Sequence, residues 1–239
     1  MKYVLDVHTH TLASGHSYST IREMANMASD KGLELLGITE HGPRMPGTCH
    51  NFYFSNLKVV PRKMSGVELL LGIELNILDF EGHIDLDEWM LRQMDVTIAS
   101  MHPPCYKSGS VEENTRAYLN VLKNPYVNII GHPDDNRYKI DYGAFVYAAK
   151  ENGKLIEFNN ASLNPGGARV DAVQNDYVIL DLCKKYNQPI ILGSDAHIDV
   201  DILNYERAQK VLDEVNFPEE LIINTAVDKL KKYVNRYNK

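Results

Sequence analysis

The sequence has 239 residues, of which 44% are hydrophobic and 24% are charged, and its formal net charge is -7. This length and composition suit one substantial core, so we expect residues 1–239 to form a single domain. The acidic balance argues against a nonspecific nucleic-acid binder, because such proteins carry an excess of Lys and Arg.

The N-terminal segment MKYVLDVHTHT contains a short apolar run that Asp6 and His8 interrupt. It therefore has the features of neither a signal peptide nor a membrane span, and we expect a cytoplasmic protein without membrane association. The cysteines Cys49, Cys105 and Cys183 show no CxxC spacing. Their number and placement argue against a disulfide framework and against a thiolate zinc site.

Short apolar segments alternate along the chain with segments of helical periodicity. This alternation predicts repeated βα units and an α/β fold. The seven expected strands cover residues 3–7, 35–39, 69–77, 96–100, 127–131, 155–159 and 190–193.

Helix starts are indicated by two capping-box patterns, Thr20 with Glu23 and Ser110 with Glu113. The stretches around 203–215 and 226–237 also have helical spacing, and we expect them to pack on the outside of the barrel. Residues 42–61 form a long aromatic loop that is a candidate lid, substrate wall or subunit contact. Trp89 has helical neighbours and is expected in the core.

Polar residues gather where the expected strands end. The carboxyl ends of strands in a βα barrel converge on one face, so these side chains are expected to meet there. Six of the seven expected strands supply such residues, which are His8, His10, His41, Glu74, His102, His132, Asp195 and His197.

Histidine clustering favours a metal site over isolated structural histidines. His8 and His10 are two apart in an extended segment, so both imidazoles point the same way and can reach one ion. A lone histidine at a strand end is more often a hydrogen-bonded structural residue, but most of the nine histidines fall near these ends. Nitrogen and oxygen ligands without thiolate suit zinc, our preferred metal, and also manganese or iron.

Several segments resemble the PHP (polymerase and histidinol phosphatase) family, and within it the YcdX-like stand-alone metal-dependent phosphatases. They are D-V-H-T-H-T (6–11), G-H-S-Y-S (15–19), I-T-E-H-G-P (38–43), G-I-E-L-N (72–76), S-M-H-P (100–103), I-G-H-P (130–133) and G-S-D-A-H (193–197). The resemblance implies a distorted (β/α)7 TIM-like barrel with a trinuclear metal site at the C-terminal ends of the strands.

The same resemblance implies how the ions are held. His8, His10, Glu74 and Asp195 would hold the first ion; Glu74, His102 and His132 the second; His16, His41 and His197 the third. Glu40 stands where the family more often has Asp. Because this residue would lie behind the ligands, the difference would only tune the metal site.

The implied reaction is hydrolysis of small-molecule phosphate monoesters. A hydroxide bridging the first two ions would attack phosphorus, and the third ion would stabilise charge on the phosphate or leaving group. Asp134 and a metal-bound water are candidates for the acid, although Asp134 can equally be a loop cap. Basic residues near the strand ends can clamp phosphate oxygens or be ordinary surface charges; they are Arg44, Arg62, Lys107, Arg137 and Arg169.

Alternative functions remain open at this point. Histidinol phosphate is the second candidate substrate within the phosphatase interpretation. A binuclear amidohydrolase that cleaves C–N bonds also begins with HxH, but it does not need His16, His41 and His197. A nuclease role lacks a basic or aromatic track for a strand, and a noncatalytic metal-binding module would be expected to lack ligands. The resemblance also suggests a homotrimer.

Overall fold

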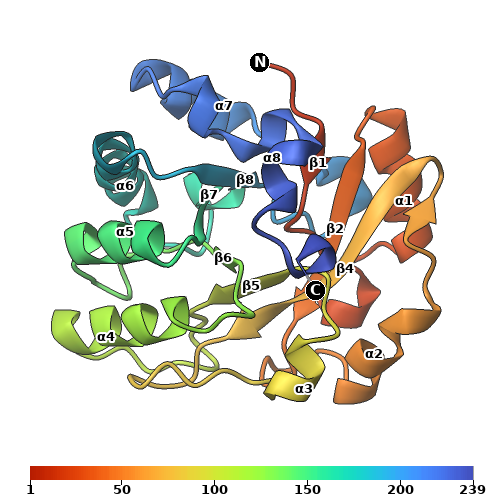
Figure 1. The fold of residues 1–239 in the computed structure, drawn as a ribbon, viewed down its shortest axis with the longest axis horizontal. Helices are drawn as coiled ribbons and strands as arrows, with labels where there is room; N and C mark the ends of the chain where they lie inside the picture. Colours follow the sequence, from red (N-terminus) through yellow and green to blue (C-terminus); the bar gives the residue numbers. More distant parts are fainter. Residues whose placement is uncertain (239) are drawn as a thin grey trace.

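The computed structural model describes residues 1–238, and its centre is a parallel β-sheet that curls into a barrel (Figure 1). Neighbouring strands pair in the order β1-β2-β4-β5-β6-β7-β8. These strands are β1 (Leu5–Asp6), β2 (Leu35–His41), β4 (Val67–Asn76), β5 (Thr97–Ser100), β6 (Ile129–Ile130), β7 (Leu155–Asn159) and β8 (Ile190–Gly193). The seven predicted strands are confirmed. A further strand, β3 (Lys63–Met64), pairs antiparallel with β4 and was not predicted.

The first and last strands meet just beyond their C-terminal ends. The backbone N–H of Asp195 donates to the His8 carbonyl at 3.0 Å, and that of His10 donates to the Ala196 carbonyl at 2.9 Å. These bonds close the barrel at the face where the predicted ligands lie. The predicted distorted α/β barrel is therefore confirmed.

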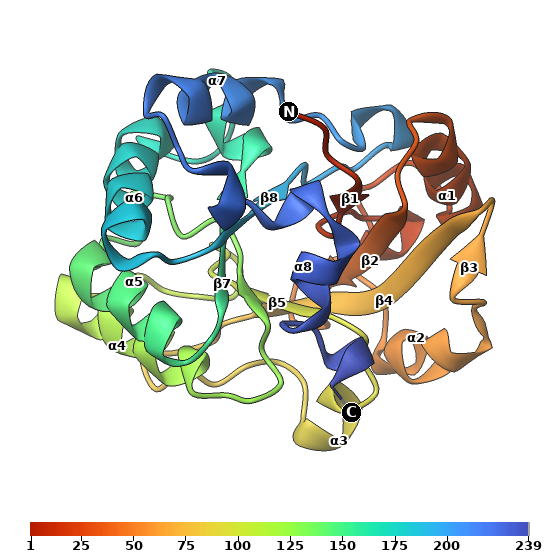
Figure 2. The ribbon, with the colours of Figure 1, turned by 45° about the horizontal axis from the view of Figure 1, so that its top comes forward.

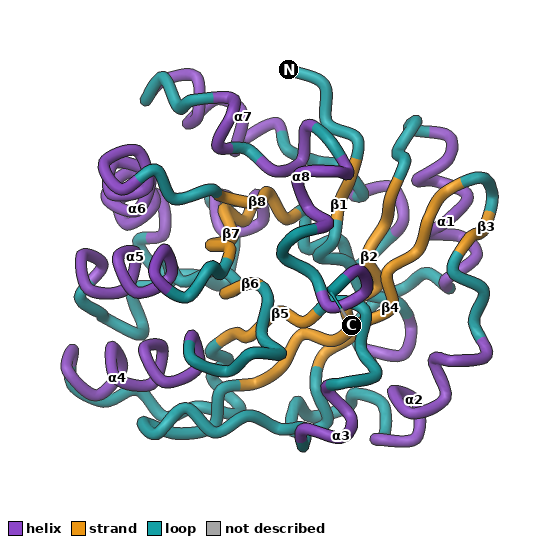
Figure 3. Tube along the Cα trace, in the orientation of Figure 1, coloured by secondary structure: helices purple, strands orange, loops and turns teal. Residues whose placement is uncertain are grey.

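Helices surround the barrel, and in Figure 2 α4, α5 and α6 lie on the side opposite α1 and α2. The helices are α1 (Ile21–Asp30), α2 (Asn51–Asn56), α3 (Glu88–Leu91), α4 (Val111–Leu122), α5 (Tyr142–Glu151), α6 (Ala172–Tyr186), α7 (Glu206–Glu214) and α8 (Val227–Lys231). Both predicted capping boxes are present, at Thr20 before α1 and at Ser110 before α4. Loops separate β2 from α2 and β5 from α4 (Figure 3). No helix within residues 1–238 is long and apolar enough to cross a bilayer.

Two hydrophobic clusters form the core. One lies between the strands and the outer helices. The other fills the barrel interior with residues such as Leu35, Leu70 and Ile98, and it includes Leu230 and Val234 from the C-terminal segment. That segment covers the N-terminal end of the barrel, which leaves the opposite end for the polar site.

Strand β4 shows how the period-two alternation builds this arrangement. Leu69, Leu71 and Ile73 pack in the outer cluster, whereas Leu70 packs inside the barrel. Glu74 is four residues beyond Leu70, so the alternation of side chains turns it to the same interior face, near the C-terminal end of the barrel. The interior is thus apolar at one end and polar at the other.

Two predictions outside the barrel need correction. Trp89 is 64% exposed, because the short helix α3 buries Met90 and Leu91 instead. The predicted helical stretches at 203–215 and 226–237 are shortened to α7 and α8, and the second ends in a separate 3-10 turn at Asn235–Tyr237.

Candidate metal centre

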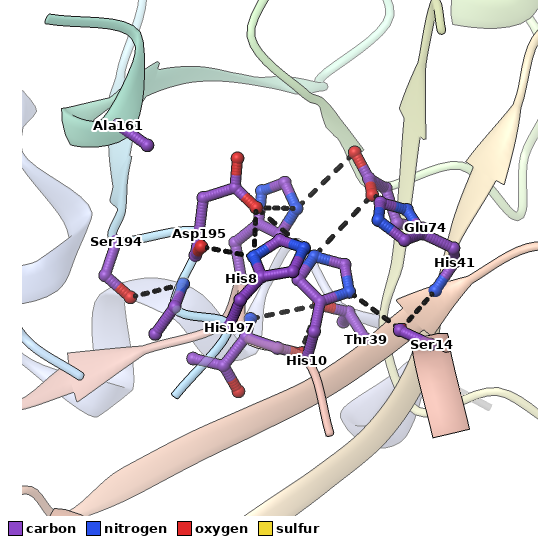
Figure 4. Close-up of polar contacts among 12 residues, drawn as sticks. His8, His10, Ser14, Thr39, His41, Glu74, Ala161, Ser194, Asp195 and His197 are labelled. Atoms are coloured by element: carbon purple, nitrogen blue, oxygen red, sulfur yellow. Dashed lines mark hydrogen bonds and ion pairs between the residues drawn. The ribbon is translucent and has the colours of Figure 1, made fainter. Parts of the chain in front are cut away.

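The structure brings together all nine side chains that the sequence analysis proposed as ligands. His8, His10 and His16 follow β1, His41 ends β2, and the others come from β4 or from the loops after β5, β6 and β8. Figure 4 shows part of this cluster, with His8 and His10 between the carboxylates of Glu74 and Asp195. Three groups of residues have ligand atoms within 4.8 Å of one another: His8, His10 and Glu74; His41, Glu74 and His102; and His10, His41 and His197.

Glu74 lies at the centre of the cluster and is completely buried. Its Oε1 is 2.9 Å from His132 Nε2, 3.2 Å from His102 Nε2 and 3.4 Å from His8 Nε2. Its Oε2 is 2.6 Å from His41 Nδ1 and 3.7 Å from His10 Nε2. Each carboxylate oxygen therefore faces a different set of imidazoles, which is the arrangement of a ligand that can bridge two ions.

The surroundings of Glu74 favour its ionised form. Burial alone raises the pKa of the carboxyl, but the neighbouring His102, His8 and His41 outweigh burial and hold the pKa well below its usual value. A second carboxylate, Asp195, lies 3.3 Å from His10 Nε2 and 3.6 Å from His8 Nε2 through Oδ1. Both acids are thus available as anionic oxygen donors.

His16 belongs to a more open part of the cluster. Its Nε2 lies 3.2 Å from His41 Nε2 and 3.2 Å from His197 Nε2. His16 is exposed and His197 is half-buried, unlike the fully buried His8 and His10. His16 and His197 therefore lie toward the mouth of the site, while the buried His41 links them to Glu74.

Four buried ligand atoms make no well-directed hydrogen bond among the described residues, although two of them, His41 Nδ1 and Glu74 Oε2, lie 2.6 Å apart; the other two are His8 Nε2 and His10 Nε2. A buried polar atom without a partner costs on the order of 1–3 kcal/mol, so four in one cluster are unfavourable unless something else binds them. Divalent cations bound within the cluster would satisfy them. The residues therefore fit bound metal ions.

The second ring nitrogens of several histidines are already occupied. His8 Nδ1 lies 2.5 Å from Glu157 Oε1, His102 Nδ1 lies 2.8 Å from Asn76 Oδ1, and His197 Nδ1 lies 2.8 Å from the Asp195 carbonyl oxygen. Such contacts fix the tautomer and leave Nε2 free to face an ion. This is the arrangement that metal-binding histidines adopt.

The backbone supports the same interpretation. His132 and Asp195 have φ angles of 31° and 57°, in the left-handed region that residues other than glycine seldom adopt. Strained residues of this kind concentrate at functional sites, where surrounding contacts hold them. The Glu157 carboxylate accepts the N–H of His132 at 2.9 Å and so stabilises one of them.

A hollow of about 460 Å³ opens above the cluster. Met45, Met101, Pro103 and Pro104 form an apolar part of its wall. The remaining lining residues are His16, His41, Glu74, His102, His132, Asp135, Arg137, Ala161, Asn164, Gly167, Ala168, Arg169, Asp195 and His197. The hollow is therefore large enough for a small molecule and carries the ligand cluster on its floor.

Two of the four proposed phosphate-binding arginines line the hollow. Arg169 donates to Asp195 Oδ2 at 2.8 Å, and Arg137 forms an ion pair with Asp135. Arg44 is exposed and does not line it. Arg62 lies at the opposite end of the barrel, where Nε donates to Asp95 Oδ2 at 2.5 Å. The structure thus does not bring Arg44 and Arg62 to the hollow.

Asp134 lies behind the hollow rather than on it. The residue is 1% exposed, and burial raises the pKa of its carboxyl while Arg169 partly opposes that effect. Three further polar residues also lie apart from the cluster. His50 caps α2, His83 pairs with Asp79, and Lys107 is exposed.

The cysteines play no part in the cluster. Cys49 and Cys105 are free, and burial raises the pKa of each thiol to about 11. Both are therefore protonated at neutral pH. From the loop at 42–61, Met45 reaches the hollow, while Tyr53 donates to Glu40 Oε1 at 3.1 Å.

Comparisons with known proteins identify relatives of this chain. A family model described as PHP domain matches residues 6–223. A protein from Clostridium novyi (strain NT) named probable phosphatase is 50% identical over 239 residues, which covers 100% of this chain and 97% of the relative. A protein of the same name from Thermoanaerobacter sp. (strain X514) is 48% identical over 235 residues, covering 98% of this chain and 95% of the relative.

Among solved structures, the histidinol phosphate phosphatase from Lactococcus lactis has a similar fold. It aligns with a TM-score of 0.62 and 21% sequence identity over 90% of this chain and 94% of its own. That protein was crystallised with zinc, L-histidinol and phosphate. At this identity the likeness supports the fold.

Proposed function

We propose that this chain, which belongs to the PHP family and is a phosphatase, hydrolyses phosphate monoesters at a site for three divalent metal ions. One observation carries the proposal most strongly. Three buried imidazole nitrogens without well-directed hydrogen bonds surround Glu74, and Glu74 Oε2 is a fourth such atom. The two oxygens of Glu74 face different sets of imidazoles. Such an arrangement suits several ions held around a shared carboxylate.

The proposed first ion is held by His8, His10, Glu74 and Asp195, and the second by Glu74, His102 and His132. The distances from Glu74 Oε1 to the second group support that pairing. The third ion is held by His16, His41 and His197, and His16 Nε2 lies 3.2 Å from the Nε2 of each of the other two. Zinc is our preferred metal; nitrogen and carboxylate donors without thiolate suit it, as they also suit manganese or iron.

Bound divalent ions supply an activated water nucleophile and stabilise charge on the phosphate and the leaving group. Side chains around the hollow orient the phosphate and contact the organic group of the ester. Arg169 and Arg137 place positive charge on the wall of the hollow, where they can orient phosphate oxygens. Met45, Met101 and Pro103 provide an apolar surface for the organic group of the ester. Because Asp134 is buried behind the hollow, we propose that the leaving group takes its proton from water.

The third group of imidazoles also argues against a binuclear C–N hydrolase. Two ions can be held by the residues around Glu74 and Asp195, so His16 would have no role in such an enzyme. Histidinol phosphate is one candidate substrate, and the Lactococcus structure with L-histidinol makes it the first to test. Cytoplasmic location and homotrimeric assembly stay predictions of the sequence.

Elemental analysis combined with a substrate panel tests the proposal. We expect purified protein to carry close to three divalent ions per chain and to hydrolyse a simple aryl phosphate. A panel of phosphomonoesters that includes histidinol phosphate would rank substrates, with an aryl amide as the matched control. Full activity with at most one ion, or cleavage of the amide instead of the phosphate, would contradict the proposal.

A further inference from the structure

Glu157 is a buried acid that stands outside the proposed ligand set. It lies in the middle of β7 and is 3% exposed. Leu155, two residues earlier, packs inside the barrel, so alternation turns Glu157 to the same interior face. Its two oxygens contact protein groups around the cluster.

The first oxygen orients His8. Glu157 Oε1 lies 2.5 Å from His8 Nδ1, and this contact leaves His8 Nε2 facing Glu74 at 3.4 Å and Asp195 at 3.6 Å. An ionised carboxylate that holds one ring nitrogen of a histidine fixes its tautomer and makes the other nitrogen a better ligand. The direction of the His8 ring thus depends on Glu157.

The second oxygen reaches the other side of the cluster. Glu157 Oε2 accepts the N–H of His132 at 2.9 Å and the side-chain amide of Asn159 at 3.0 Å. The His132 backbone is strained, with a φ of 31°, and this bond helps to hold it. The same Asn159 amide also lies 3.3 Å from Asp195 Oδ2.

The neighbouring strand leaves room for this carboxylate. A Cβ at position 193 would lie 1.9 Å from Glu157 Oε1, so an alanine there would displace the oxygen from its place beside His8. Gly193 is therefore part of the same arrangement. Its substitution disturbs the contact without changing any charge.

We propose that Glu157 is a positioning residue that couples the first two ion sites and leaves the third independent. The inference rests on the proposed function, since it takes those sites as given. Glu157 contacts His8 and His132 directly and Asp195 through Asn159. In residues 1–238 it makes no hydrogen bond to His16, His41 or His197. Loss of its charge should therefore weaken two sites together.

Metal binding by Glu157→Gln tests this inference without reliance on turnover. We expect the affinity of two of the three ions to fall by about 10–100-fold, the usual cost of losing a group that orients a ligand. After dialysis against a chelator the variant should keep about one ion, while wild-type protein keeps three. In cobalt-substituted protein, the absorption of the first two ions should weaken and that of the third should persist.

Asp95→Asn is the matched control, because it neutralises a buried carboxylate at the other end of the barrel. Gly193→Ala should repeat the selective loss of two ions, and it keeps the inference testable if Glu157→Gln does not fold. Unchanged affinity for all three ions in a folded variant would overturn the inference, as would equal loss of all three. Wild-type protein that binds at most one ion would instead overturn the proposed function.

Discussion

The two ends of the barrel both bury charged side chains, but they differ in how those side chains are paired. At the N-terminal end, Asp95 accepts from Arg62 Nε at 2.5 Å and from the Leu71 N–H at 3.1 Å. Lys154 donates to the carbonyls of Asn124 and Val127 at 2.8 and 2.6 Å. At the C-terminal end, by contrast, Glu74 Oε2 and three imidazole nitrogens beside it are buried without well-directed hydrogen bonds among residues 1–238.

Cavity volume alone would suggest a ligand site at the N-terminal end of the barrel, away from the histidine cluster. Hollows of about 630 and 570 Å³ lie at the N-terminal end, whereas the one above the histidines is about 460 Å³. Buried groups that are fully paired stabilise a fold, while unpaired ones cost free energy and persist where a ligand binds them. Hydrogen-bond pairing therefore separates the two ends better than volume does. Substitutions at each end should show the same separation.

The largest effect is expected for Glu74→Gln. This change preserves shape but removes the one carboxylate that faces imidazoles through both oxygens. Metal content and turnover should fall together, with turnover lower by at least about 10³-fold, the upper range for losing one electrostatic stabiliser. Elemental analysis and initial rates would measure both. Glu68→Gln, at the opposite end of the same strand, is the control and should leave both unchanged; wild-type turnover in Glu74→Gln would place the bridge elsewhere.

His16→Ala should have a smaller and more selective effect. The remaining ligands around Glu74 stay in place, so the protein should fold and keep about two ions. Turnover of a phosphomonoester should fall by roughly 10²-fold, and inorganic phosphate should inhibit more weakly. His83→Ala is the control, because His83 pairs with Asp79 on the surface away from the cluster. Full activity with two ions would defeat the three-metal mechanism and reopen the binuclear alternative.

Asp95→Asn should reverse this pattern by reducing stability while leaving the site intact. The change removes the charge that Arg62 pairs with, and we expect the free energy of unfolding to fall by about 2 kcal/mol. Urea denaturation would measure the loss, and metal content and turnover should match those of the wild type. Selective loss of ions at unchanged stability would show that the two ends are coupled.

These contrasts also show how far the sequence could predict the structure. The strands and the strand-end residues could be predicted because strand periodicity and the HxH spacing constrain where side chains point, whereas the division of ligands among the ions, with His16, came from the resemblance to the PHP family. Glu157 was missed, although its segment L-I-E-F-N repeats the pattern of G-I-E-L-N around Glu74. That repetition was the available signal, since an acid in a buried strand needs a partner.

Other features depend on tertiary packing, which the local sequence pattern does not determine. Arg62 lies near a strand in the sequence, but β3 runs antiparallel to β4 and carries it to the N-terminal end. Trp89 has apolar neighbours, yet the four-residue helix α3 turns it to solvent. In both cases the local pattern was compatible with more than one position in space.

The smallest expected effect comes from Lys154, which is paired but lies at the edge of the larger hollow. Burial lowers the pKa of its ammonium from 10.5 to about 8. Between these values the unfolded chain binds a proton that the folded chain lacks, so the free energy of unfolding rises with pH through this window. Below about pH 8 the folded protein also carries the buried charge, so this contribution to the free energy of unfolding is absent.

The comparison of wild type with Lys154→Met isolates this contribution, because the other titrating groups are shared. Partial access of Lys154 to solvent limits the effect. Between about pH 7.5 and 9.5 we expect the free energy of unfolding of wild type to rise by about 1 kcal/mol relative to that of the variant. Urea denaturation at both values would measure the difference, with exposed Lys232→Met as the control from the same hollow. Equal pH dependence in wild type and Lys154→Met would mean that the carbonyls of Asn124 and Val127 fully compensate the buried charge. Lys154 would then differ from the histidine cluster even more sharply, because no part of its buried charge would remain unsatisfied.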